Sequence, residues 1–172
     1  MKATKDLALI GVYTALLICS QFALTAISGV EIVTLLFTAF CFYFGVWRGV
    51  ALATTFSLLR IIIFGFFPNV LVLYLIYYNL FALVVGSLGK VMNKTINLKN
   101  VFIVVIVVLI MTILFTVIDN IVTPLFYAYT SEMTNAYWKL SLTAVIPQSI
   151  CAVISVSLLF PPLVRIFEKI KL

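Results

Sequence analysis

Few side chains in this chain could do acid–base, nucleophilic or metal chemistry. There is no histidine, and the five acidic residues are well separated in the sequence: Asp6, Glu31, Asp119, Glu132 and Glu168. Without histidine, a Ser-His-Asp or Cys-His nucleophilic site, a histidine-ligated zinc and an imidazole base are all excluded. Catalysis by paired carboxylates and binding of metals by carboxylates need clustered acids. The sequence therefore predicts no enzyme, no metal and no cofactor.

The composition predicts a membrane protein. Of the 172 residues, 65% are hydrophobic and 9% are charged, whereas about 25% are charged in a typical soluble domain. The net charge of +6 does not indicate a nucleic-acid partner, because the basic residues lie in short gaps between apolar runs and form no basic stripe. The length fits one domain, residues 1–172.

Six apolar segments are candidates for membrane-spanning helices, which need about 20 mostly apolar residues. They cover residues 7–27, 31–46, 50–67, 70–88, 101–124 and 141–165. Six spans place both termini on one side, and the intracellular choice puts nine of the eleven basic residues inside. The positive-inside rule then predicts an all-α integral membrane protein, a compact bundle of six transmembrane helices with the N- and C-termini in the cytoplasm. The link 125–140 is predicted to be an outer aqueous loop, in which Glu132 and Lys139 are solvated and which could act as a lid.

Polar side chains gather in the outer half of the predicted bundle. Charged groups inside a bilayer are costly and mark functional sites. Arg60 lies about 10 Å below the outer end of the third segment, at a rise of 1.5 Å per residue. Five helices contribute to this layer, with the residues Arg60, Glu31, Asp119, Asn120, Asn79 and Gln148. This asymmetry favours a substrate pocket that opens outward and is closed toward the cytoplasm.

Aromatic side chains share this depth. Tyr74 and Tyr78 are spaced i,i+4, on one face of the fourth segment, and Trp138 lies in the outer link. An interfacial aromatic belt would explain such residues equally well, so both interpretations stay open. Arg60 also has two interpretations, an ion pair with Glu31 or Asp119, or a forked bond to an anionic or carbonyl group of a ligand.

The first segment carries a stripe of small residues. Gly11 and Ala15 have the small-xxx-small spacing that lets another helix approach closely in lipid. The stripe could pack inside the bundle or could dock a partner protein.

Four stretches resemble a known family: Lys5–Ala15, Glu31–Leu36, Phe44–Gly49 and Phe160–Arg165. Together with the six predicted spans, they are similar to the substrate-binding S components of energy-coupling factor (ECF) vitamin transporters. In that family an Ala-xxx-Ala motif on the first helix packs against the transmembrane T component. Here Gly11 replaces the first alanine and Ala15 matches the second.

The resemblance implies a function and partners. An S component of the bacterial cytoplasmic membrane binds a vitamin or cofactor precursor from outside, and then associates with a T component and two cytoplasmic ATPases to release it inside. The chain lacks the Gly-rich phosphate loop of ATPases, so ATP hydrolysis would belong to those partners. Two alternatives stay open, a self-contained secondary carrier and a non-transporting membrane scaffold. The residues do not choose between a carboxylate-bearing, a flat-ring and a cationic substrate.

Overall fold

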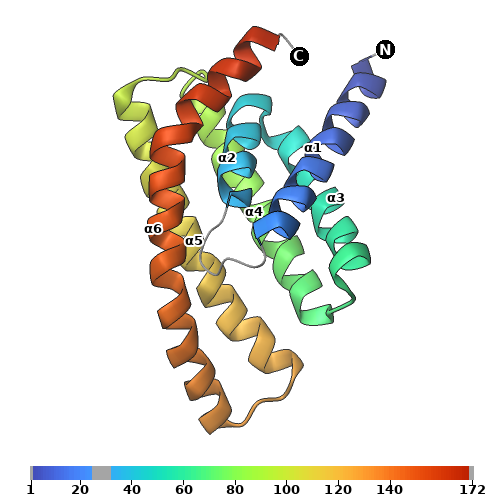
Figure 1. Ribbon diagram of the computed structural model, residues 1–172, viewed down its shortest axis with the longest axis vertical. Helices are drawn as coiled ribbons and strands as arrows, with labels where there is room; N and C mark the ends of the chain where they lie inside the picture. The colour runs from blue at the N-terminus through green and yellow to red at the C-terminus, as the bar shows by residue number, and fades with distance from the viewer. Residues whose placement is uncertain (1, 25–31, 171–172) are drawn as a thin grey trace.

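The computed structural model describes residues 2–24 and 32–170, which form six helices (Figure 1). The helices are α1 (Lys2–Leu24), α2 (Val33–Phe44), α3 (Val46–Phe64), α4 (Pro68–Val91), α5 (Leu98–Phe126) and α6 (Ser131–Ile170). All except α2 are long and apolar enough to cross a membrane. The described helices therefore indicate a multi-pass membrane protein with a helical bundle, which is the coarser part of the predicted fold class.

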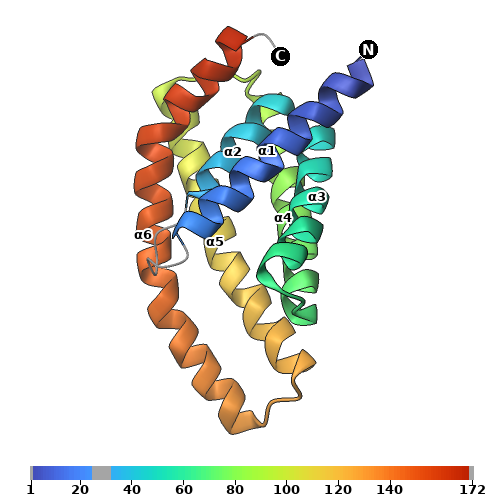
Figure 2. The same cartoon turned by 45° about the vertical axis from the view of Figure 1, so that its right-hand side comes forward.

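The helix α2 is short and enclosed. Its 12 residues span about 18 Å, less than the 30 Å or so of a bilayer core. Eleven of them are buried, and α2 packs against α1, α3, α4 and α6 in the middle of the bundle (Figures 1 and 2). A helix that is apolar on every side belongs in an interior. The predicted span 31–46 is therefore not confirmed, and its first residue, Glu31, lies outside the described residues.

Glycine and proline set the corners between α2, α3 and α4. Gly45 alone joins α2 to α3, with a φ of 83° that L side chains rarely adopt. The predicted break between these helices, at Arg48-Gly49, was therefore placed about one turn too late. The turn after the third segment was predicted at Pro68-Asn69 and lies a few residues earlier, because α3 ends at Phe64 and α4 begins at Pro68, where the fixed φ of proline suits the first helical position.

Two glycines of α4 allow it to touch the corner between α2 and α3. A Cβ on Gly86 would lie 2.8 Å from the backbone nitrogen of Val46, and a Cβ on Gly89 would overlap the carbonyl oxygen of Phe42. Both neighbours are backbone atoms, which cannot rotate away as a side chain can. The lack of a side chain at Gly86 and at Gly89 therefore allows the backbone of α4 to approach the corner between α2 and α3 this closely.

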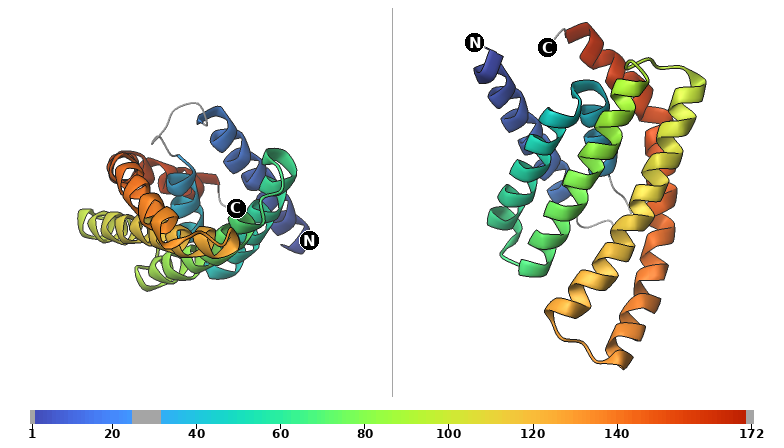
Figure 3. Two further views of the ribbon diagram at one scale, coloured as in Figure 1. Left: turned by 90° about the horizontal axis from the view of Figure 1, so that it is seen from below. Right: turned by 180° about the vertical axis from the view of Figure 1, so that it is seen from behind.

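The hairpin of α5 and α6 is longer than the rest of the bundle. With 29 and 40 residues, these helices measure about 43 and 60 Å, and their joined ends project beyond the turn between α3 and α4 (Figures 1 and 3). The predicted aqueous loop 125–140 is therefore wrong in part. Glu132 and Lys139 are exposed, but they lie on the first turns of α6, which begins at Ser131 and not at residue 141.

Both ends of the described chain lie at the same end of the bundle (Figures 1 to 3). The corner at Gly45 and the link between α4 and α5 lie there too. Arg48 donates to the Asp6 carboxylate at 2.7 Å, and this end also carries Lys90 and Lys94. The basic side chains are thus separated from the polar groups near the turn between α3 and α4, as the sequence predicted. Below, the end of the bundle that carries both ends of the described chain is called the terminal end. The opposite end, at the turn between α3 and α4, is called the hairpin end.

Candidate functional site

Arg60 lies between aromatic rings near the hairpin end of α3. Its guanidinium carbon is 4.4 Å from the ring centroid of Tyr74 and 5.2 Å from that of Phe64. Cations over aromatic faces are attracted by the ring quadrupole, more strongly where water is excluded. The Arg60 Nε is buried and has no hydrogen-bond partner among the described residues. One donor of this cation is thus buried without a described acceptor.

The Tyr74 ring connects Arg60 to α1. Gln21 Nε2 donates to the Tyr74 hydroxyl at 2.9 Å, so a polar side chain of α1 reaches the same point. The sequence analysis had not singled out Gln21, although an amide within an otherwise apolar segment was a signal for it. The arginine, the tyrosine and the glutamine bring α3, α4 and α1 together around one site.

A cluster of aromatic rings continues inward from Tyr74. The Tyr74 and Tyr78 ring centroids are 5.1 Å apart, which confirms the predicted i,i+4 face. Around Tyr78, Phe37 of α2 lies at 5.0 Å and Phe56 of α3 at 5.2 Å, both edge to face. Tyr74 and Tyr78 are buried at 8% and 3% exposure. They are therefore core residues and not members of an interfacial belt.

A narrow gap lies beside this aromatic cluster. It contains about 200 Å³ of empty space, too narrow for a water molecule, and is lined by Thr34, Tyr77, Tyr78, Thr112, Phe115 and Gln148. The predicted site residue Gln148 thus faces the same rings from α6. Side chains would have to move before this gap could admit a small molecule.

Asp119 belongs to a hydrogen-bond network closer to the hairpin end. Thr123 and Tyr137 donate to its two carboxyl oxygens, each at 2.7 Å. Asn69 donates to the Thr123 hydroxyl at 3.2 Å and accepts from Tyr127 at 3.2 Å. This network ties the start of α4 to α5 and to the first turns of α6.

The predicted pairing of Arg60 with Asp119 is not observed. Among the described side chains, residues 4–24 and 32–169, only Arg48 and Asp6 come within ion-pair distance. The Asp119 oxygens are instead occupied by hydroxyl donors of α5 and α6. The other predicted partner, Glu31, lies outside the described residues. Within the described part of the chain, Arg60 is therefore held by aromatic rings and not by a carboxylate.

The remaining predicted residues fall in separate places. Asn120 Nδ2 donates to the Ser141 hydroxyl at 2.7 Å, while its Oδ1 is buried with no partner among the described residues. Asn79 bonds to Thr54 of α3 at 3.3 Å and to a carbonyl of its own helix, so it joins α3 to α4 apart from Arg60. Trp138 is 37% exposed on the projecting part of α6. Only Arg60, Tyr74, Tyr78 and Gln148 are brought to the aromatic cluster.

The small-residue stripe of α1 is on the outside of the bundle. Gly11 and Ala15 are both exposed, and a Cβ on Gly11 would meet nothing within 4 Å. The alternative that this stripe packs inside the bundle is therefore wrong for the described chain. Leu7, Val12 and Phe22 are also exposed on α1, at 73%, 73% and 69%.

Comparisons with protein families, curated proteins and solved structures find no match for this chain. The class of protein therefore rests on its own features. Its described helices and their apolar composition indicate a multi-pass membrane protein. Its most distinctive internal feature is an arginine that faces a buried aromatic cluster.

Proposed function

We propose that this chain is the membrane-embedded, substrate-binding S subunit of an ECF-type importer. In this proposal it captures a vitamin or cofactor precursor outside the bacterial cell membrane with high affinity. A T component and two cytoplasmic ATPases then drive delivery inward. The observation that carries the proposal is Arg60, a cation within an apolar helix. Its Nε has no described partner, and its guanidinium carbon lies 4.4 Å from the centroid of the Tyr74 ring.

The proposed orientation places all six helices in the bilayer region, with both termini in the cytoplasm. The terminal end carries Lys90, Lys94 and Arg48, and an excess of basic residues is typical of the cytoplasmic side. The hairpin end, with Arg60 and the aromatic cluster, then faces outward. A substrate from outside would reach this site without crossing the bundle.

Arg60 and the aromatic rings suit a small molecule with a flat ring and an anionic or carbonyl group. A guanidinium offers several donors in a fixed plane and forms charge-assisted bonds to such groups. Tyr74 and Tyr78 offer apolar ring faces, and Gln148 and Gln21 offer amide groups nearby. Binding would widen the narrow gap beside Tyr78. A ligand that binds the folded protein and not the unfolded chain stabilises the folded form, so the liganded protein would be the more stable one.

The exposed stripe of α1 supports the proposed partnership. Gly11 and Ala15 leave a shallow, side-chain-poor strip on the outside of the bundle. In lipid, helices associate by close van der Waals packing at such small residues. We propose this strip as the surface that meets the T component.

The experiment that tests the function uses the whole protein, purified in detergent from cells grown with vitamins. Denaturation and mass spectrometry should release a small vitamin-like molecule in near-stoichiometric amount. Arg60→Gln should reduce that amount at least tenfold, while the yield of folded protein stays the same.

Arg48→Gln is the matched control for this substitution. Arg48 is also on α3 and also lies over a phenylalanine ring, at 5.8 Å, but it is at the terminal end and paired with Asp6. It should keep the ligand. Empty wild-type protein, or equal ligand loss in the two variants, would contradict a binding site at Arg60. Uptake by the chain alone in liposomes would instead favour the self-contained carrier.

A further inference from the structure

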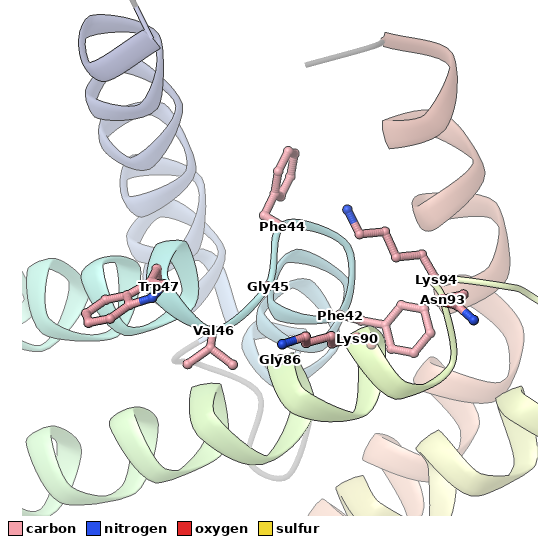
Figure 4. A pocket seen from close by; sticks show the side chains of 10 residues that line it. Phe42, Phe44, Gly45, Val46, Trp47, Gly86, Lys90, Asn93 and Lys94 are labelled. Carbon is pink, nitrogen blue, oxygen red and sulfur yellow. The ribbon is translucent and has the colours of Figure 1, made fainter.

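A hollow of about 510 Å³ opens at the terminal end, away from the aromatic cluster. It lies between the corner that joins α2 to α3 and the last turns of α4 (Figure 4). Its lining comprises Phe42, Phe44, Gly45, Val46, Trp47, Gly86, Gly89, Lys90, Asn93 and Lys94. This volume is within the range of about 300–1,000 Å³ typical of small-molecule sites. The sequence analysis treated the two lysines only as markers of orientation.

The hollow combines positive charge with apolar walls. Lys90 and Lys94 extend from the end of α4 toward the opposite corner (Figure 4), and none of the ten described lining residues is acidic. On the other side, the first turn of α3 contains no acidic residue and has no side-chain cap. The free N–H groups of a helix start favour negative charge. Both sides of the hollow therefore attract an anion.

The polar rim is held in a defined conformation. Asn93 and Lys94 both have positive φ, 49° and 57°, and this turn is secured by hydrogen bonds from Lys94 N to Gly89 O at 3.0 Å and from Asn93 N to Lys90 O at 3.2 Å. The Lys94 ammonium also lies 4.8 Å from the Tyr43 ring centroid. A preformed site loses less entropy on binding.

The position in the membrane selects the kind of anion. Trp47, which is 88% exposed at the start of α3, has the side chain typical of a membrane–water interface. Val91 and Leu98 are 79% and 92% exposed on either side of the link between α4 and α5, where lipid chains would cover them. Basic hollows between membrane helices on the cytoplasmic side suit anionic headgroups.

We propose that this hollow binds the phosphate headgroup of an anionic phospholipid from the adjacent leaflet. Lys90 and Lys94 contact the phosphate, the start of α3 faces it, and Trp47 and Val46 contact the glycerol and the first methylenes. This site rests on the membrane embedding of the chain and on the proposed orientation, and it stands or falls independently of substrate binding at Arg60 and of transport.

The test measures lipid retention by the whole purified protein. After exchange into detergent with added phosphatidylglycerol or phosphatidylcholine, native mass spectrometry should show retained phosphatidylglycerol and little phosphatidylcholine. The double variant Lys90→Gln, Lys94→Gln should bind phosphatidylglycerol about 30-fold more weakly, which corresponds to about 2 kcal/mol. Lys99→Gln is the matched control, because Lys99 is an exposed lysine at the start of α5 that does not line this hollow.

Two further arms separate the possible sources of the anion. Phosphatidylglycerol should raise the melting temperature of the protein, and free glycerol phosphate should not. An equal rise with both would assign the hollow to a soluble phosphate compound and overturn the proposal. A photoreactive phosphatidylglycerol in wild-type protein should label peptides from the α2–α3 corner or the end of α4. Labelling elsewhere, or equal retention by the double variant and Lys99→Gln, would refute the site. Protection of both lysines from acetylation by a protein subunit, with no lipid bound, would identify a protein interface instead.

Discussion

Replacing Gly89 with alanine should force α2 and α4 apart, because this glycine lies against backbone. A Cβ at this position would overlap the Phe42 carbonyl oxygen and lie 2.9 Å from the Phe42 Cα. Carbon atoms in contact prefer about 3.5–4.0 Å, so the helices would have to separate by about 0.6 Å or more. No side-chain rotation relieves the overlap.

The expected cost follows from what surrounds the contact. Phe42 is 1% exposed, and Val85, one turn before Gly89 on α4, is fully buried, so separation opens a gap in a packed core. A gap of about 0.5–1 Å already forfeits a quarter to a half of each atom pair's attraction, and overpacking of this kind costs about 1–3 kcal/mol. Alanine regains about 1 kcal/mol of helix propensity. A net loss of about 1 kcal/mol should lower the melting temperature by roughly 2–4 °C.

Gly11→Ala is the matched control, because the same substitution is made in a helix with open space around it. Nothing lies within 4 Å of a Cβ on Gly11, so only the helix propensity changes. Its melting temperature should be unchanged or higher by roughly 2–4 °C. Thermal unfolding of both variants is followed by tryptophan fluorescence in one detergent. Equal melting temperatures for Gly89→Ala and Gly11→Ala would refute the close backbone contact between α2 and α4.

Three further predictions concern other contacts. Ala15→Leu should abolish co-purification with a T component and leave the ligand content unchanged. The control Ala144→Leu, on the exposed side of α6, should change neither. A T component retained by Ala15→Leu would exclude the proposed docking strip. Tyr13→Phe removes a buried 2.9 Å bond to the Leu36 carbonyl and should cost about 1 kcal/mol, seen as a melting temperature lower by roughly 2–4 °C; an unchanged value would disprove that bond's contribution. Tyr137→Phe leaves a carboxyl oxygen of the α5 network without its 2.7 Å donor and should speed proteolysis of the link between α5 and α6; wild-type cleavage rates would contradict this anchoring role.

Local sequence signals located the helix ends only approximately. A turn was predicted at Pro68-Asn69 and a helix from residue 70, whereas α4 starts at Pro68, because proline fixes φ and needs no amide donor there. The start of α6 was placed ten residues too late because apolar runs were used to find spans. Residues 131–140 are more polar, yet they belong to the helix, and Tyr137 among them bonds to Asp119 of α5. Hydropathy reports the lipid-facing length of a helix and not its full length.

Hydropathy also could not distinguish α2 from a membrane span. A helix that is apolar on every side has the same composition whether lipid or protein surrounds it. The enclosure of α2 depends on packing against α4 and α6, which come later in the chain. Pairings between distant segments are not encoded in any local window.

The candidate site could be predicted in part for the same reason. Helical spacing placed Tyr74 and Tyr78 on one face, and their depth matched that of Arg60. Asn79 follows Tyr78 directly, so about 100° of helix rotation turns it toward Thr54 instead. Gln21 was missed because nothing in the sequence sets the register of α1 against α4.

The enclosure of α2 has a consequence for how the chain is made. At about 18 Å, this helix is too short to be inserted into a bilayer as an independent segment. Two of the helices that surround it, α4 and α6, are synthesised after it. During translation, α2 is therefore made before two of the helices that cover its apolar surface. Its environment is completed by the 40-residue helix α6, which begins about 90 residues further along the chain.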